Sequence, residues 1–112
     1  MVQCNSHIAW LLAYPPDSRA LLAESFIEVM RDDAMVLRKA HNTGGSLVEP
    51  LHKIKGGLAM IGYDSLYEKA KMLLDYLLDQ MSVEPFEIDW FVRELESSVA
   101  SVERWFFDSD NV

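Results

Sequence analysis

Residues 18–41 have the sequence SRALLAESFIEVMRDDAMVLRKAH, and the hydrophobic pattern of this stretch decides the fold class. Its apolar residues recur at spacings of four, three, four and three positions: Ala23, Ile27, Met30, Ala34 and Leu37. Residues at these spacings share one face of an α-helix. The stretch is therefore predicted to be a long amphipathic helix, with Asp17 or Ser18 as its N-cap and Gly44 after its end.

Three further segments have the same helical periodicity, at residues 47–61, 65–81 and 85–107. A Ser-x-x-Glu capping box at Ser65 and Glu68, with Asp64 as a competing cap, is predicted to start the second of them. Gly62 ends the first, and Pro85 suits the first turn of the third. The predicted core stripes are Leu51, Ile54, Leu58 and Ile61, then Leu66, Ala70, Leu73 and Leu77, then Val92, Leu95, Val99, Val102 and Phe106.

Short connections between long helices favour antiparallel neighbours. The sequence thus predicts an all-α fold, an antiparallel up-down-up-down four-helix bundle, preceded by a short helical segment around residues 8–12. The whole chain, residues 1–112, is expected to be one domain, because single domains usually contain ~100–150 residues.

Charge and cysteine content narrow the range of partners. The chain has 18 Asp and Glu against 10 Lys and Arg, for a net charge of −8. Such a surface repels polyanions, so nucleic acid and anionic membrane surfaces are not expected as main partners. No stretch approaches the ~18 uninterrupted apolar residues needed to span a bilayer, so membrane insertion is not expected. The single cysteine, Cys4, cannot form an internal disulfide, and the N-terminus lacks the pattern of a signal peptide. We expect a cytoplasmic monomer.

Residues 51–62, LHKIKGGLAMIG, depart from the pattern of a plain amphipathic helix. Each of the adjacent glycines Gly56 and Gly57 costs ~1 kcal/mol in a helix relative to alanine. At about 100° per residue, His52, Lys55, Gly56 and Ala59 fall on one face away from the core stripe. A neutral imidazole is a nucleophile, a lysine one turn away offsets the charge of a phosphoryl group, and a glycine beside the ring leaves space for a partner.

This stretch resembles the signature of histidine-containing phosphotransfer (HPt) domains, which has His, any residue, an aliphatic residue, Lys or Arg, and Gly, with a later Gly. The resemblance includes His52, Ile54, Lys55, Gly56 and Gly62; the signature's small residue is Leu58, or Ala59 one position later. More loosely, the resemblance extends over residues 18–107.

The resemblance implies specific roles. His52 is the phosphoryl acceptor, Lys55 neutralises charge, and Gly56 gives clearance for a receiver domain. Leu74 is at the position where some relatives carry a polar residue that orients the histidine, with Lys71 and Asp75 as nearby substitutes. The implied protein is a phosphorelay intermediate without kinase activity and without a cofactor or metal of its own. Its implied partners are receiver domains of response regulators, which supply Mg²⁺, and a hybrid sensor histidine kinase.

Two other function classes are possible: a helical adaptor that carries no phosphate, and a small metal-binding bundle. The sequence lacks the Glu-x-x-His pairs on facing helices that a carboxylate-bridged metal site requires. The remaining polar motifs are interpreted as structural: Cys4-x-x-His7 as free surface residues, His41 as a helix-end residue, and Asp32-Asp33 as a solvated pair. Four aromatic residues are predicted to pack in the core or at bundle ends (Trp90, Trp105, Phe106 and Phe107), and residues 108–111 are predicted to be a frayed tail.

Overall fold

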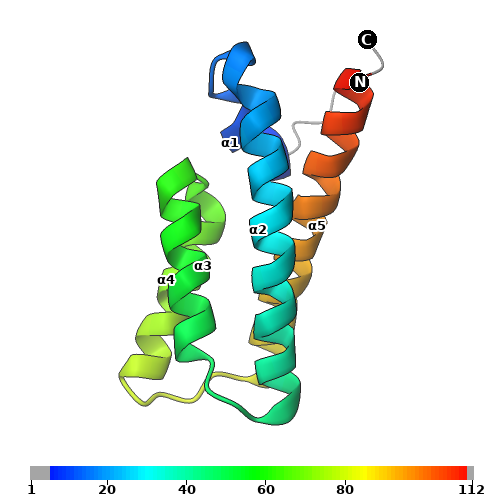
Figure 1. Cartoon of the computed structure of the whole chain (residues 1–112). Coiled ribbons are helices and arrows are strands. Elements are labelled where there is room, and N and C mark those ends of the chain that lie inside the picture. The colour runs from blue at the N-terminus through cyan, green and yellow to red at the C-terminus, as the bar shows by residue number, and fades with distance from the viewer. Residues whose placement is uncertain (1–5, 111–112) are drawn as a thin grey trace.

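A computed structural model describes residues 6–110, and within that range the chain forms five α-helices and no strand. The helices are α1 (Ser6–Leu12), α2 (Pro16–Thr43), α3 (Val48–Ile61), α4 (Asp64–Leu78) and α5 (Pro85–Asp110) (Figure 1). The all-α prediction is confirmed. The four long helices lie at the predicted segments, with different ends, and the short N-terminal helix includes the predicted residues 8–12.

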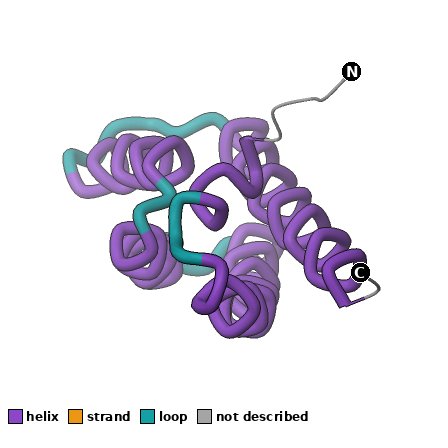
Figure 2. The backbone as a smooth tube through the Cα atoms, turned by 90° about the horizontal axis from the view of Figure 1, so that it is seen from above, coloured by secondary structure: helices purple, strands orange, loops and turns teal. Residues whose placement is uncertain are grey.

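Successive long helices reverse the direction of the chain, as the colours of Figure 1 show. α2 packs mainly against α5 and α3 packs mainly against α4, with smaller contacts between α2 and α3 and between α4 and α5. Seen from above, the helices lie side by side and the loops connect them at their ends (Figure 2). α3 therefore has one face against its neighbours and one face away from them.

The predicted stripes form most of the core. Of their eighteen positions, fourteen are buried; the exceptions are half-buried residues close to helix ends or flanks, namely Ile27, Ile61, Leu77 and Phe106. α1 packs against α2 and α5. Its Trp10 is buried, with its ring centroid 4.9 Å from that of Phe26 and 5.9 Å from that of Tyr63.

Three helices end with a residue in the left-handed conformation. Gly44 (φ 72°) follows α2 and Gly62 (φ 78°) follows α3, as predicted. Gln80 (φ 59°) plays the same part after α4, where the Met81 amide donates to the Tyr76 carbonyl at 2.8 Å. α4 consequently ends at Leu78 and not at residue 81. The end of α4 is hard to predict from the sequence, because non-glycine residues such as Gln80 rarely adopt the left-handed conformation.

The predicted N-caps are wrong for two helices. Pro15 is the N-cap of α2, and Asp17 lies within its first turn, where a carboxylate still interacts favourably with the helix dipole. α4 starts after Tyr63 with no side-chain cap, so neither Asp64 nor the Ser65 and Glu68 box is used. α5 does begin at Pro85, and the Glu84 amide donates to Glu87 Oε2 at 3.1 Å.

Several surface predictions are also wrong. Asp33 is only 4% exposed, whereas Asp32 is exposed as expected. Trp90 and Phe107 are 46% and 60% exposed, and the Lys69 ammonium lies 5.0 Å from the Trp90 ring centroid. The backbone of residues 108–110 continues α5, so it is not a frayed tail. The predicted position Asn111 lies outside the described residues.

None of the helices within residues 6–110 combines the length and the apolar character needed to cross a bilayer.

Candidate functional site

The exposed face of α3 carries the residues that the sequence singled out. Leu51, Ile54 and Leu58 are fully buried and fix which side of α3 meets the core. Because successive residues are rotated by about 100°, this fixes His52 and Gly56 on the other side. Both are exposed. The sequence prediction of a polar, solvent-facing patch on this helix is confirmed for these two residues.

The His52 imidazole has no hydrogen-bond or ion-pair partner among residues 6–110. The residue is exposed, and no described residue holds either ring nitrogen. A ring nitrogen with a free lone pair can act as a nucleophile or accept a group from another molecule.

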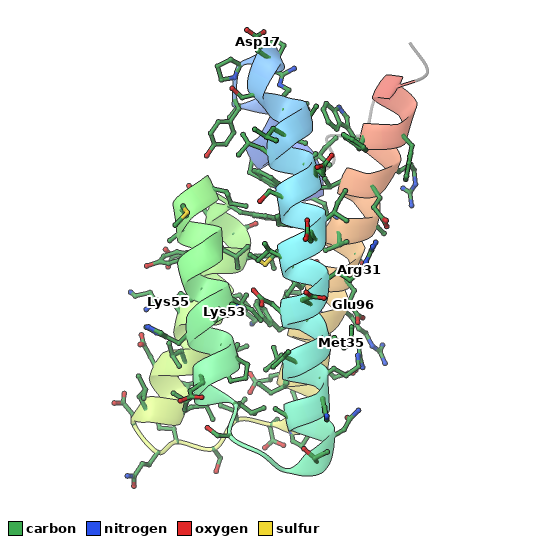
Figure 3. The ribbon with its side chains drawn as sticks, in the orientation of Figure 1. Asp17, Arg31, Met35, Lys53, Lys55 and Glu96 are labelled. Carbon is green, nitrogen blue, oxygen red and sulfur yellow. The ribbon has the colours of Figure 1, made fainter. Side chains whose placement is uncertain are left out.

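The two lysines near His52 differ in their partners. Lys53 Nζ lies 3.1 Å from Asp33 Oδ1, so this cation bridges α3 to the buried carboxylate of α2. Lys55, one turn after His52, is half-buried and forms no ion pair with any described residue. Figure 3 shows both side chains on α3. Lys55 is thus the lysine available to an anionic group bound near the imidazole.

The adjacent glycines have different surroundings. A Cβ added at Gly56 would meet nothing within 4 Å, so packing inside the chain does not require a glycine there. A Cβ at Gly57 would lie 2.7 Å from Met30 Cε, so Gly57 permits the close approach of α2 and α3. Of the two glycines, only Gly56 is not required by packing among the described residues, and it lies one helical turn from His52.

Apolar residues that lie beside the site and are exposed would form an apolar seam next to His52. Met60, at 84% exposure, and Ala59 are exposed, whereas Leu47 and Val48 are half-buried against the core. The seam is therefore confined to the C-terminal half of α3.

No described residue orients the imidazole. Leu74, at the position where some HPt domains have a polar residue, is 2% exposed and belongs to the core. Lys71 and Asp75 are exposed on α4, and neither forms a hydrogen bond with His52.

Asp33 is the residue near the site that the sequence analysis missed. It follows Phe26 and Met30 and precedes Leu37 at spacings of four, three and four, the same spacings that mark the core face. Its charge led to the prediction of a solvated residue. The periodicity was the better signal, because a buried carboxylate is tolerated when a cation reaches it.

The other histidines are not part of the site. His7 Nδ1 lies 3.3 Å from Ser101 Oγ, and Nε2 lies 3.4 Å from Glu94 Oε1, so the prediction of a free surface residue is wrong. Cys4 lies outside the described residues. His41 is in the last turn of α2, as expected. Within residues 6–110 no three His, Cys, Asp or Glu side chains are grouped so that they could hold a metal ion.

Comparison of the chain with protein-family models, with curated proteins and with solved structures gave no match. The site therefore has to be interpreted from its own geometry.

Proposed function

We propose that this chain is a phosphotransfer protein of the HPt type, an antiparallel up-down-up-down four-helix bundle with a short N-terminal helix. In this proposal His52 accepts a phosphoryl group from the aspartate of one receiver domain and passes it to another. The chain is a carrier without kinase activity. Its partners are cytoplasmic response-regulator receiver domains and a hybrid sensor histidine kinase, and the Mg²⁺ belongs to the receiver.

One observation carries the proposal: the exposed imidazole of His52, which has no partner among residues 6–110, lies one turn from Gly56, where packing does not require a glycine. Glycine in the middle of an exposed helix face costs stability. A glycine at this position allows the active site of a partner to approach the ring closely, and this role would account for the lost helix stability.

In the transfer step this chain supplies only the nucleophile, which is His52, and the positive charge of Lys55. The Nε2 lone pair of neutral His52 attacks the phosphorus of the aspartyl phosphate. The bond between phosphorus and the carboxylate oxygen breaks, and the aspartate leaves with that electron pair. The imidazolium then loses its Nδ1 proton to water, and Lys55 offsets the charge of the phosphoryl group. Transfer to the second receiver reverses these steps.

Radiolabel transfer tests the proposal. The full chain is mixed with each member of a panel of receiver domains that have been loaded from radiolabelled acetyl phosphate. We expect label on the wild-type chain and on the control His41→Gln, and none on His52→Gln. Equal labelling of His52→Gln, or no labelling of the wild type by any receiver, would overturn it.

A helical adaptor is the second candidate, and the buried Leu74 favours it, because no polar group orients the imidazole from that position. An adaptor would bind receivers without becoming labelled. Binding measured in the same mixtures therefore distinguishes the two functions.

A further inference from the structure

A groove between α2 and α5 runs along the side of the molecule away from α3. It contains two hollows, of about 340 Å³ and about 290 Å³. Arg31 and Glu103 line both hollows, and their side chains form an ion pair across the groove. Figure 3 shows Arg31, Met35 and Glu96 on this side, while Lys53 and Lys55 belong to α3.

Each hollow is lined partly by apolar residues, and one of these is a large exposed side chain. Phe107, at 60% exposure, lies in the larger hollow with Ile27 and Phe106. Met35, at 61% exposure, lies in the smaller one beside Ala34 and Val99. Large exposed apolar side chains beside a hollow are typical of surfaces that bind another molecule.

The charges of the two hollows differ. The larger one is lined by Glu24, Glu28 and Asp32 in addition to the Arg31 and Glu103 pair, so its rim has a clear excess of negative charge. In the smaller one the charges balance, because Arg38 pairs with Glu96 at 2.8 Å. A second copy of this chain would bring the same acidic rim and a net charge of −8. A basic partner fits this rim, and self-association does not.

The spacing of the hollows fits a helix. On α2 the larger hollow is lined by residues between 24 and 32 and the smaller by residues between 31 and 38, so their midpoints are about six residues or ~9 Å apart along the axis. Two apolar side chains at positions i and i+7 of a docked helix lie on one face and are ~10 Å apart, close to this separation.

We propose that this groove binds an amphipathic helix of a partner protein. That helix has apolar anchors seven residues apart, which enter the two hollows, and Lys or Arg side chains that face Glu24, Glu28 and Asp32. This site is separate from His52, and the inference does not depend on the phosphotransfer proposal.

Two synthetic peptides provide the probe. Both are fourteen-residue helical sequences with leucines at i and i+7; one carries lysines on its flanks and the other carries glutamates. Each is titrated into the isotope-labelled full chain, and amide chemical shifts are followed. We expect the lysine peptide to shift amides along residues 24–38 and 96–107, and to bind at least tenfold more weakly to Phe107→Ser. The glutamate peptide is expected not to bind.

Matched variants exclude a general attraction of a basic peptide to an acidic protein. Phe86→Ser removes an aromatic residue that is 70% exposed and lies outside the groove, and it is expected to leave binding unchanged. Glu24→Lys with Glu28→Lys is expected to weaken binding, and Glu68→Lys on α4 is not. Unchanged affinity in Phe107→Ser, shifts spread over all helices, or dimerisation through the groove in sedimentation experiments would overturn the proposal.

Discussion

The Lys55 ammonium is the one cation on the exposed face of α3 that no described residue pairs with. In the proposed function, replacing it would remove a favourable interaction with the transferred phosphoryl group while leaving the fold unchanged. Lys55→Ala is expected to slow transfer to His52 by about fivefold, which corresponds to ~1 kcal/mol. Stopped-flow transfer rates measure this, with Lys39→Ala on α2 as the control. A rate equal to that of the control would contradict the role of Lys55.

Gly56 allows stability and transfer to be separated. A side chain there meets open space, and glutamine favours helix more than glycine does. Gly56→Gln is expected to raise the free energy of unfolding by ~0.5 kcal/mol while it blocks the approach of a receiver and slows transfer by about tenfold. Urea denaturation and transfer rates are measured on the same variant. A stabilised variant that still transfers at the wild-type rate would show that Gly56 gives no clearance.

At the scale of helices, α2 and α3 are joined by the ion pair of Asp33 and Lys53. Lys53→Met leaves the buried Asp33 carboxylate without its cation, and we expect this to cost ~1–3 kcal/mol of stability. Adding Asp33→Asn removes the buried charge and is expected to recover most of that loss. Urea denaturation of the wild type, the two single variants and the double variant gives a double-mutant cycle that measures the coupling energy of the ion pair. Lys39→Met is the reference for an unpaired lysine. A loss no larger than that of the reference would contradict the coupling.

Existence and type of every helix could be predicted from periodicity, since burial follows the core stripes closely. The C-terminal ends of helices could be predicted where glycine marks them: Gly44 and Gly62 were found, and Gln80 was not. The burial of Asp33 and the exposure of Trp90 and Phe107 depend on which neighbour each helix meets, and one-dimensional spacing does not determine that. The exposure of His52 and Gly56 was predictable, because it follows from the stripe on their own helix.

At the scale of the whole molecule, Tyr63 connects the turn between α3 and α4 to α5. Its hydroxyl lies 2.6 Å from Oγ of the fully buried Ser98. Burial raises the pKa of Tyr63 above its ordinary value, and the charge of Glu94 acts in the same direction, against the hydrogen bond with Ser98. A raised pKa in the folded state means that this contribution to stability is complete below pH ~10 and is lost as the pH rises through the folded pKa.

The free energy of unfolding is therefore expected to fall in the alkaline range more steeply for the wild type than for Tyr63→Phe. The variant should also lose ~1 kcal/mol at neutral pH, because Ser98 loses its hydrogen-bond partner. Urea denaturation between about pH 7 and 11 checks both effects. Identical alkaline slopes in the two proteins would refute the assignment.

The molecule has two faces with different chemistry. α3 presents His52 and Lys55, and α2 with α5 presents an acidic, partly apolar groove. The groove was not predictable from the sequence, because it depends on the pairing of two helices that are far apart in the chain. If both proposals hold, this separation would let the chain exchange phosphate on one side while a partner helix is bound on the other.

Imidazole nitrogen signals of the full chain test the central claim most directly. They are recorded by NMR after addition of a phosphorylated receiver domain that transfers label to the chain. We predict a new Nε2 resonance for His52, with a coupling to phosphorus, and no change in His7 or His41. Loss of the receiver's phosphate with the His52 signals unchanged, or a phosphorus coupling at another histidine, would contradict it.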